Sequence, residues 1–168
     1  MINGSDGTFF PPFRTRHDKL YAFSPDMCRS YSLVYLRDNN VNGLHTYDYH
    51  VPEDLFWNTA ENAGFCDEGF CLGNGVLNIS KCYGGISGFV SMPHFLNAEA
   101  KFGEAVDGLH PNASVHDFVL HFEPNAGVPV AGNIRLQINF YLRRDENIEL
   151  VKNVQPALFP LFWFDDVS

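Results

Sequence analysis

The stretch IRLQINFYL, residues 134–142, alternates large apolar side chains with Arg, Gln, Asn and Tyr. A repeat of two residues is typical of a β-strand with one apolar and one polar face. Such a strand belongs to an antiparallel sheet that covers a core or a cavity on its apolar side. We therefore predict that an apolar set lines this core or cavity: Leu136, Ile138 and Phe140. Gln137 and Asn139, which lie between them, should meet water or polar neighbours.

The segments around this stretch extend the sheet. Residues 118–123 and 128–142 predict a long hairpin across the turn PNAG at 124–127. Residues 158–164 predict a final apolar strand, with Pro160 at an edge or a bulge.

The amino-terminal half predicts a second hairpin and two short helices. Residues 30–36 and 44–51 read as strands on either side of the turn NNVNG at 39–43. Residues 52–57 begin with Pro and predict a short helix. A second helix is expected from an N-cap at Asn97 to Gly108. The predicted fold class is mainly β with short helices.

Composition excludes several classes of protein. The 168 residues are 45% apolar and 15% aromatic, which is enough to build a core and argues against a disordered chain. The net charge of -9 argues against a nucleic-acid partner. The longest apolar stretch, 157–164, is too short for a membrane helix, and residues 1–10 do not resemble a signal peptide.

No residue pattern predicts catalysis, a metal or a cofactor. The candidate histidines, His110, His116 and His121, lack the spacing of metal ligands. The stretch GISGF, residues 85–89, lacks the second glycine of a hydrolase nucleophile elbow. A hydrolase is therefore a minor alternative, and surface or hydrogen-bonded core histidines are the simpler interpretation.

Four cysteines and three Asn-x-Ser sequons favour an oxidising, glycosylating compartment. Sequons without a leader predict that the chain belongs to a longer protein. The sequons lie at Asn3, Asn78 and Asn112. Cys66 and Cys71 are only five residues apart, whereas Cys28 and Cys82 lie outside them. Spacing alone leaves three pairings open, together with four buried thiols.

Eight blocks of sequence, taken in order, resemble the class B scavenger receptor family. They are INGSDGTFFPPF (2–13), FSPDMCRS (23–30), ENAGFC (61–66), CLGNGVLNISKC (71–82), SMPHF (91–95), DGLHPN (107–112), FEPNAG (122–127) and RLQINFYL (135–142). The resemblance covers residues 1–168. It extends to the fatty-acid translocase, the high-density lipoprotein receptor, insect sensory neuron membrane proteins and the lysosomal integral membrane protein.

The resemblance implies a membrane receptor whose ectodomain lies between two membrane helices. That ectodomain is a large antiparallel β-barrel with short helices and a lipid tunnel, and this chain looks like its carboxy-terminal part. The first membrane helix and the helical apex would precede the chain, and the second helix would follow it. The expected location is the extracellular or lysosomal-lumen side of a membrane.

The implied function is binding and transfer of lipids, such as fatty acids, sterols or lipoprotein lipid. The alternative is a receptor that sorts a hydrolase to the lysosome. Position by position, the resemblance pairs Cys28 with Cys82 and Cys66 with Cys71. Asn3 and Asn78 match sequons of the lysosomal member, whereas Asn112 does not. The chain lacks the further cysteines of the translocase and the lipoprotein receptor, so their third bridge is not expected here.

Overall fold

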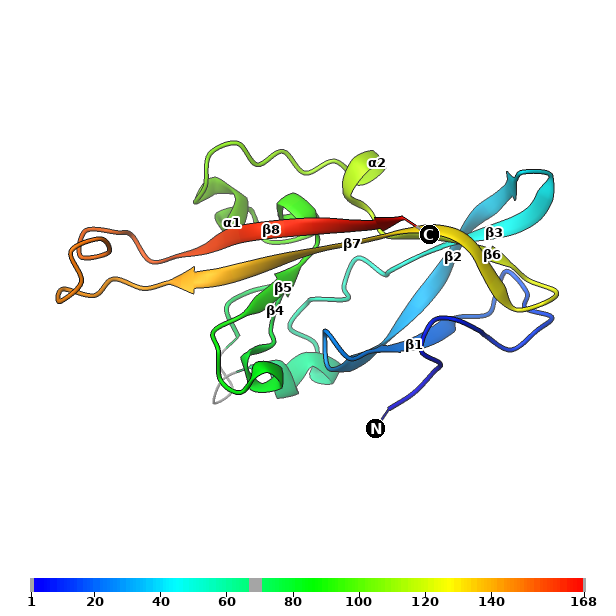
Figure 1. Ribbon diagram of the computed structural model, residues 1–168, viewed down its shortest axis with the longest axis horizontal. Helices are drawn as coiled ribbons and strands as arrows, with labels where there is room; N and C mark the ends of the chain where they lie inside the picture. The colour runs from blue at the N-terminus through cyan, green and yellow to red at the C-terminus, as the bar shows by residue number, and fades with distance from the viewer. Residues whose placement is uncertain (1, 67–70, 168) are drawn as a thin grey trace. The chain divides into compact units, whose positions relative to one another are not determined.

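The computed structural model describes residues 2–66 and 71–167 and contains an open antiparallel sheet of eight strands (Figure 1). The strand order is β1-β2-β3-β6-β7-β5-β4, and β8 also pairs with β7. The strands are β1 (Leu20–Ser24), β2 (Arg29–Val41), β3 (Leu44–His50), β4 (Val76–Asn78), β5 (Phe89–Ser91), β6 (Val119–Glu123), β7 (Val128–Leu142) and β8 (Ala157–Val167). The predicted class, mainly β with short helices, is confirmed. The described strands do not close on themselves, which is consistent with part of a larger ectodomain.

The chain forms two compact units. Unit 1 comprises Met1–Leu55, Asp117–Arg135 and Phe164–Ser168, and unit 2 comprises Phe56–His116 and Leu136–Trp163. Strands β7 and β8 contribute residues to both units.

In unit 1, the β2–β3 hairpin forms as predicted but with a shorter turn. Val41 pairs with Leu44, so only Asn42 and Gly43 connect the strands. Both have positive φ, 52° and 87°, which Asn and Gly tolerate in the tight turns of hairpins. Strand β2 therefore continues through part of the segment predicted as a loop.

Aromatic side chains fill the core of unit 1. The rings of Tyr49 and Phe122 are fully buried and meet edge to face, with centroids 5.6 Å apart. Phe10 packs against Phe122 in the same way at 5.7 Å. The predicted hairpin β6–β7 supplies Phe122, and its turn lies between Glu123 and Val128 as expected.

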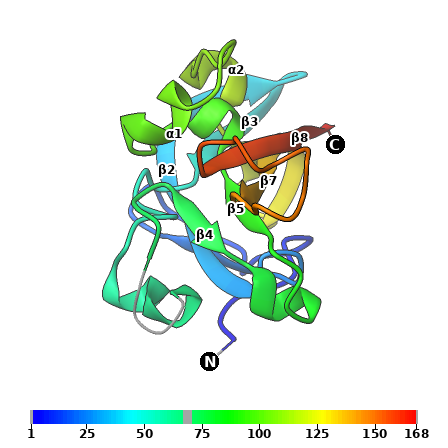
Figure 2. The same cartoon turned by 90° about the vertical axis from the view of Figure 1, so that its left-hand side faces the viewer.

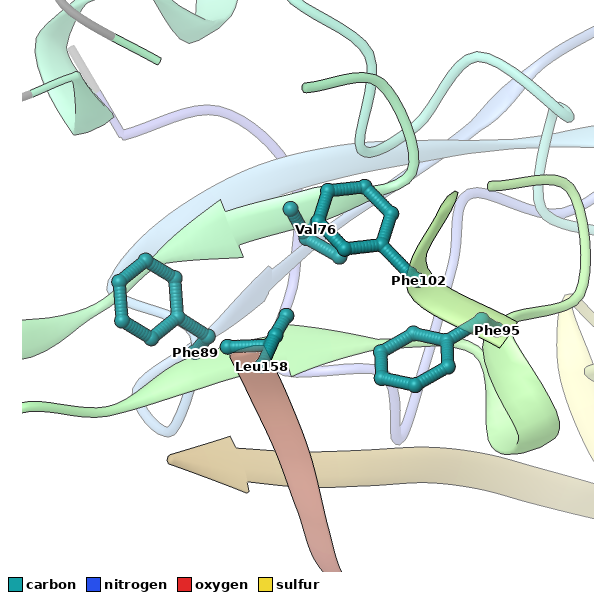
Figure 3. Packing of buried hydrophobic residues seen from close by; sticks show 5 residues of the cluster. All are labelled: Val76, Phe89, Phe95, Phe102 and Leu158. Carbon is teal, nitrogen blue, oxygen red and sulfur yellow. The ribbon is translucent and has the colours of Figure 1, made fainter. Parts of the chain in front are cut away.

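In unit 2, β4 and β5 pair with each other, and β5 pairs with the second half of β7 (Figure 2). Short helical segments surround these strands: η1 (Ala60–Phe65), η2 (Ser80–Tyr83), η3 (Pro93–Phe95), α1 (Ala100–Glu104) and α2 (Ala113–His116). The apolar core gathers residues from strands and helices that are distant in sequence (Figure 3): Val76, Phe89, Phe95, Phe102 and Leu158. Leu158 places the start of β8, the predicted final strand, in this core.

The two helix predictions need correction. Residues 52–57 form turns rather than a helix: the Leu55 N–H donates to the Pro52 carbonyl, only three residues back, at 3.0 Å, and Arg29 Nη1 donates to the Leu55 carbonyl at 2.8 Å. Asn97 is not an N-cap, since its φ of 61° is left-handed whereas an N-cap is extended. Helix α1 begins only at Ala100, so the predicted helix is much shorter in the structure.

Candidate functional site

Strand β7 is the centre of the candidate site, and its apolar face differs in part from the prediction. Leu136 is buried as expected and Ile138 is half-buried, but Phe140 is 39% exposed. Gln137 and Asn139, predicted to meet water or polar neighbours, are 1% and 0% exposed and hydrogen-bond to each other and to Ser91. This face of β7 therefore meets polar neighbours rather than water in unit 2.

The physical reason is a closed network of side-chain amides. Asn139 Nδ2 donates to Ser91 Oγ at 3.0 Å, and Gln137 Nε2 donates to Asn139 Oδ1 at 2.8 Å. Gln137 Oε1 accepts the backbone N–H of His94 at 2.8 Å. Buried polar groups are stable when they are hydrogen-bonded to one another. This face of β7 continues into the paired face of strand β5 and contacts the η3 turn.

The sequence gives only a faint signal for this network. Ser91 pairs with Gln137, and Phe89 pairs with Asn139, so the polar groups meet only once β5 has docked on β7. Period-two alternation reports the chemistry of each face but not which face is covered.

The opposite face of β7 and the neighbouring β8 present an apolar strip in unit 2, which we call the β7–β8 strip. Four large side chains of this face are more than a third exposed: Phe140, Phe159, Leu161 and Trp163. Phe162 is exposed as well, but it lies between Leu161 and Trp163 in β8 and therefore points to the other side. Residues 157–163 contain no charged side chain. Monomeric soluble proteins rarely leave such a concentration of apolar groups in water, so the strip marks a contact surface.

A hollow of about 260 Å³ lies beside the cysteine loop of unit 2. Its wall includes Phe65, Leu77, Tyr141 and Arg143, and the Arg143 guanidinium lies 5.7 Å from the Tyr141 ring centre. Pockets for small molecules usually enclose about 300–1,000 Å³. The hollow is therefore small for a ligand pocket.

A larger hollow of about 410 Å³ lies in unit 1 beside Arg14 and Lys19. Among the described residues, Arg14 Nε is buried without a hydrogen-bond partner. Hydrogen bonds from Thr15 lower the pKa of Asp18, and the positive charge of Arg14 contributes to the same shift. Asp18 therefore balances part of the Arg14 charge.

Unit 1 also contains a buried ionic cluster. The Asp48 carboxylate is fully buried and accepts from Arg37 Nε at 2.8 Å and from Asn39 Nδ2 at 3.0 Å, and it also contacts His121 Nδ1. Burial opposes its ionisation, but hydrogen bonds from His121, Asn39 and Arg37 keep its pKa below the ordinary value. The cluster has the character of a structural ion pair.

The histidines do not assemble into a metal site in the described part of the chain. No three His, Cys, Asp or Glu side chains gather there in a way that could hold an ion. His121 belongs to the Asp48 cluster on β6, whereas His116 lies on α2 and stacks on His94. His110 is exposed, and its backbone N–H donates to His94 Nδ1.

All four cysteines are oxidised. Cys66 and Cys71 form a disulfide with Cα atoms 4.6 Å apart. Cys28 and Cys82 are also disulfide-bonded, so no cysteine within residues 2–66 and 71–167 is free. The structure excludes the alternative of four free thiols, and the pairing of Cys28 with Cys82 stays a prediction.

The sequon asparagines can accept a glycan without losing a hydrogen bond. Asn78 Oδ1 accepts the Ser80 N–H at 2.9 Å, and Asn112 Oδ1 accepts the Ser114 N–H at 3.0 Å. Asn3 and Asn112 are exposed, and Asn78 is half-buried. A glycan replaces a hydrogen on Nδ2, an atom that donates to no described residue at these positions.

Comparison with known proteins decides the family. A family model described as the CD36 family matches residues 1–168. The chain belongs to the CD36 family. The resemblance to class B scavenger receptors is therefore confirmed over the whole chain.

Three relatives show how broad this CD36-family relationship is. Lysosome membrane protein 2 of Mus musculus is 39% identical over 167 residues, which are 99% of this chain and 35% of the relative. Scavenger receptor class B member 1 of Bos taurus is 37% identical over 169 residues, 99% of this chain and 33% of the relative. Sensory neuron membrane protein 1 of Plutella xylostella is 38% identical over 163 residues, 97% of this chain and 31% of the relative.

The CD36-family chain spans about a third of the length of these relatives. Their names describe receptors and membrane proteins, and none of the three is named as an enzyme. Among the described helices, none is both long and apolar enough to cross a membrane.

Proposed function

We propose that this chain is the carboxy-terminal part of the ectodomain of a membrane receptor that binds and transfers lipids. The ectodomain would lie on the extracellular or lysosomal-lumen side, and its membrane helices would lie outside residues 1–168. The β7–β8 strip is the observation that carries the proposal. In a receptor of this kind, the strip forms one wall of an apolar passage that the rest of the protein completes.

The physical argument is the burial of apolar surface. Removing apolar surface from water gains about 25 cal/mol per Å². An acyl chain or a sterol offers such surface, whereas an ion or a sugar does not. Phe140 and Leu161 are exposed in the structure, so they can contact such a ligand without unpacking the core. Fatty acids, sterols and lipoprotein lipid are the ligands that this surface favours.

Phe140→Ser in the complete protein tests the proposal, with binding of a fluorescent fatty acid and a fluorescent sterol as the measurement. Because Phe140 is 39% exposed, the variant should fold, and its affinity should fall about tenfold. Val130→Ser is the matched control, since Val130 is a similarly exposed apolar residue of β7 that lies in unit 1. Unchanged lipid affinity in a folded Phe140→Ser variant contradicts the proposal.

The second candidate is a lysosomal receptor that sorts a hydrolase. The relation to lysosome membrane protein 2 favours it, at 39% identity. Capture of a defined lysosomal hydrolase by the complete protein, unaffected by Phe140→Ser, supports sorting. Loss of lipid uptake in the same variant supports transfer.

A further inference from the structure

The hollow of about 410 Å³ in unit 1, which we call the Arg14 pocket, has no part in the proposed lipid passage. Arg14 and Lys19 bring two cations to its wall, and the rest of the wall comes from residues 3–5, 10–11 and 20–21. All of these residues belong to unit 1, whereas the β7–β8 strip belongs to unit 2. The volume lies within the range of about 300–1,000 Å³ that small-molecule pockets usually enclose. The Arg14 pocket is therefore a separate candidate site.

The Arg14 side chain lacks the partners that a half-buried guanidinium normally has. Its Nε atom is buried without a hydrogen bond, and no ion pair joins the guanidinium to a described residue. A buried donor without a partner costs free energy. The two Nη groups also donate to no described residue, but unlike Nε they are not closed off from solvent. They are the atoms of Arg14 that a ligand in the pocket can reach.

The charges around the Arg14 pocket are not balanced. None of the described wall residues is acidic, and Lys19 forms no ion pair with a described carboxylate. Asp18 balances part of the Arg14 charge, but its Oδ2 already accepts the Thr15 N–H at 2.7 Å and the Thr15 hydroxyl at 2.8 Å. Two cations and one carboxylate leave a single positive charge, which a ligand with one negative charge would neutralise.

Backbone hydrogen bonds fix the walls of the Arg14 pocket. The Arg14 N–H donates to the Pro124 carbonyl at 2.9 Å, and the Ser5 N–H donates to the Tyr21 carbonyl at 3.1 Å. Gly4 permits the second approach, because a Cβ there would lie 2.1 Å from the Tyr21 carbonyl oxygen. A pocket whose walls are already in place costs less conformational entropy when a ligand binds.

We propose that the Arg14 pocket binds a small carboxylate with a compact apolar body. The planar guanidinium of Arg can donate two parallel hydrogen bonds to a carboxylate, whereas Lys adds a point charge. The Arg14 Nη groups hold the carboxylate, and Lys19 strengthens the attraction. Phe10, Pro11 and Tyr21 supply apolar wall that suits an aromatic or short aliphatic body. The site does not rest on the proposed lipid function.

Phenylacetate is the probe for this site, and saturation-transfer NMR on the complete protein at pH 7 measures its dissociation constant. The N-glycans are first cut back to a single sugar by an endoglycosidase, because the sequon residue Asn3 belongs to the wall. Phenylacetamide has the same shape without the charge, so it should bind at least about tenfold more weakly. Phenyl phosphate carries more charge than the pocket balances, and its greater desolvation cost should make it the weaker anion.

Three results with these probes overturn the proposal. One is the absence of phenylacetate binding at about 10 mM, because a ligand of this size in a preorganised pocket should bind below that concentration. Another is equal affinity for phenylacetate and phenylacetamide, which would leave no role for the cations. The third is tighter binding of phenyl phosphate, which would exclude a carboxylate as the preferred ligand.

Variants locate the site. Arg14→Gln removes the guanidinium and should weaken phenylacetate binding at least about tenfold, with little change for phenylacetamide. Lys19→Gln, at an exposed position, should weaken it about threefold. Arg16→Gln is the matched control, since it removes the same charge nearby in the sequence but Arg16 is already paired with Asp38 at 2.9 Å. Phenylacetate affinity should not change in this control.

Urea unfolding shows whether each variant is folded. Arg14→Gln should fold, because it removes a buried donor that has no partner. Phenylacetate affinity in folded Arg14→Gln equal to that of the unmodified protein overturns the proposal, and so does an equal loss in Arg16→Gln. If Arg14→Gln does not fold, Lys19→Gln decides, and unchanged affinity in that variant overturns the proposal.

Discussion

Asn139→Asp is the sharpest test of the buried face of β7. Asn139 is fully buried, and its Nδ2 lies 3.0 Å from Ser91 Oγ, 3.3 Å from the Gln137 carbonyl and 3.4 Å from the Phe89 carbonyl. The substitution replaces this NH2 group with an oxygen and hardly changes the volume. The change in the free energy of unfolding therefore reports the loss of the hydrogen bonds of this NH2 group rather than a change in packing.

The structure sets the magnitude of the effect. An ionised carboxylate at this position would face two carbonyl oxygens without water, so the folded protein must keep the new group protonated. Holding a proton at pH 7 on a group whose ordinary pKa is about 3.9 costs about 1.36 kcal/mol per pH unit, or about 4 kcal/mol. A typical domain has only about 5–15 kcal/mol of stability, so the loss is large.

Urea unfolding of the complete protein at pH 7 and pH 4.5 measures the effect. The folded variant binds a proton that its unfolded form releases above about pH 4, so its deficit relative to the unmodified protein should shrink in acid. We expect the variant to be less stable than the unmodified protein by about 4 kcal/mol at pH 7 and by about 1 kcal/mol at pH 4.5. Asn40→Asp is the control, since Asn40 is exposed and uses only Oδ1, which accepts the Gly43 N–H. A deficit below about 1 kcal/mol at pH 7, or one that does not depend on pH, refutes the reasoning.

Three further predictions concern the covalent and ionic features of the chain. Non-reducing peptide mapping should pair Cys28 with Cys82, and any other partner for Cys28 contradicts the pairing. Site-occupancy mass spectrometry of protein from a eukaryotic secretory pathway should find glycans at Asn3 and Asn78, and two empty sites argue against a luminal or extracellular location. Asp48→Asn should lower the free energy of unfolding by about 1–3 kcal/mol at pH 7, because it removes the charged acceptor of the hydrogen bonds from Arg37 and Asn39, whereas the Arg37 side chain is 66% exposed and stays hydrated. Since the folded pKa of this carboxyl is lowered, its contribution is lost as the pH falls below about 4, and the variant should show a flatter acid limb in unfolding titrations.

The sequence predicts the strands well because their signals are local. Alternation and turn residues are sufficient to place the hairpin β6–β7 and the strand β8. The turn at Asn42 and Gly43 is also a local signal. The predicted strand at 30–36 is nevertheless too short, because polar residues make up the second half of β2. The predicted end of a strand is wrong where the strand continues into polar sequence. Hydrogen bonds to the partner strand hold such a segment, and they leave no apolar pattern in the sequence.

The failures have a common physical cause, which is a contact between distant segments. Arg29 Nη1 donates to the Leu55 carbonyl and so links the turn at 52–57 to the start of β2. Glu99 Oε1 accepts the Asn74 N–H at 2.6 Å instead of capping α1. Gln137 and Asn139 become buried because β5 brings Ser91 to them. None of these contacts leaves a periodic signal in the sequence.

The two faces of β7 in unit 2 should contribute independently to stability and ligand binding. Asn139 anchors the amide network on one face, and Phe140 belongs to the β7–β8 strip on the other, because successive strand residues point to opposite sides. We therefore expect Asn139→Asp with Phe140→Ser to show stability losses that add to within about 0.5 kcal/mol in urea unfolding. Lipid affinity, measured at a urea concentration where both proteins stay folded, should follow the Phe140 change alone. A coupling above about 1 kcal/mol would mean that the two faces share one packed core. In that case the strip is interior structure that the rest of the chain covers, and the lipid passage must lie elsewhere.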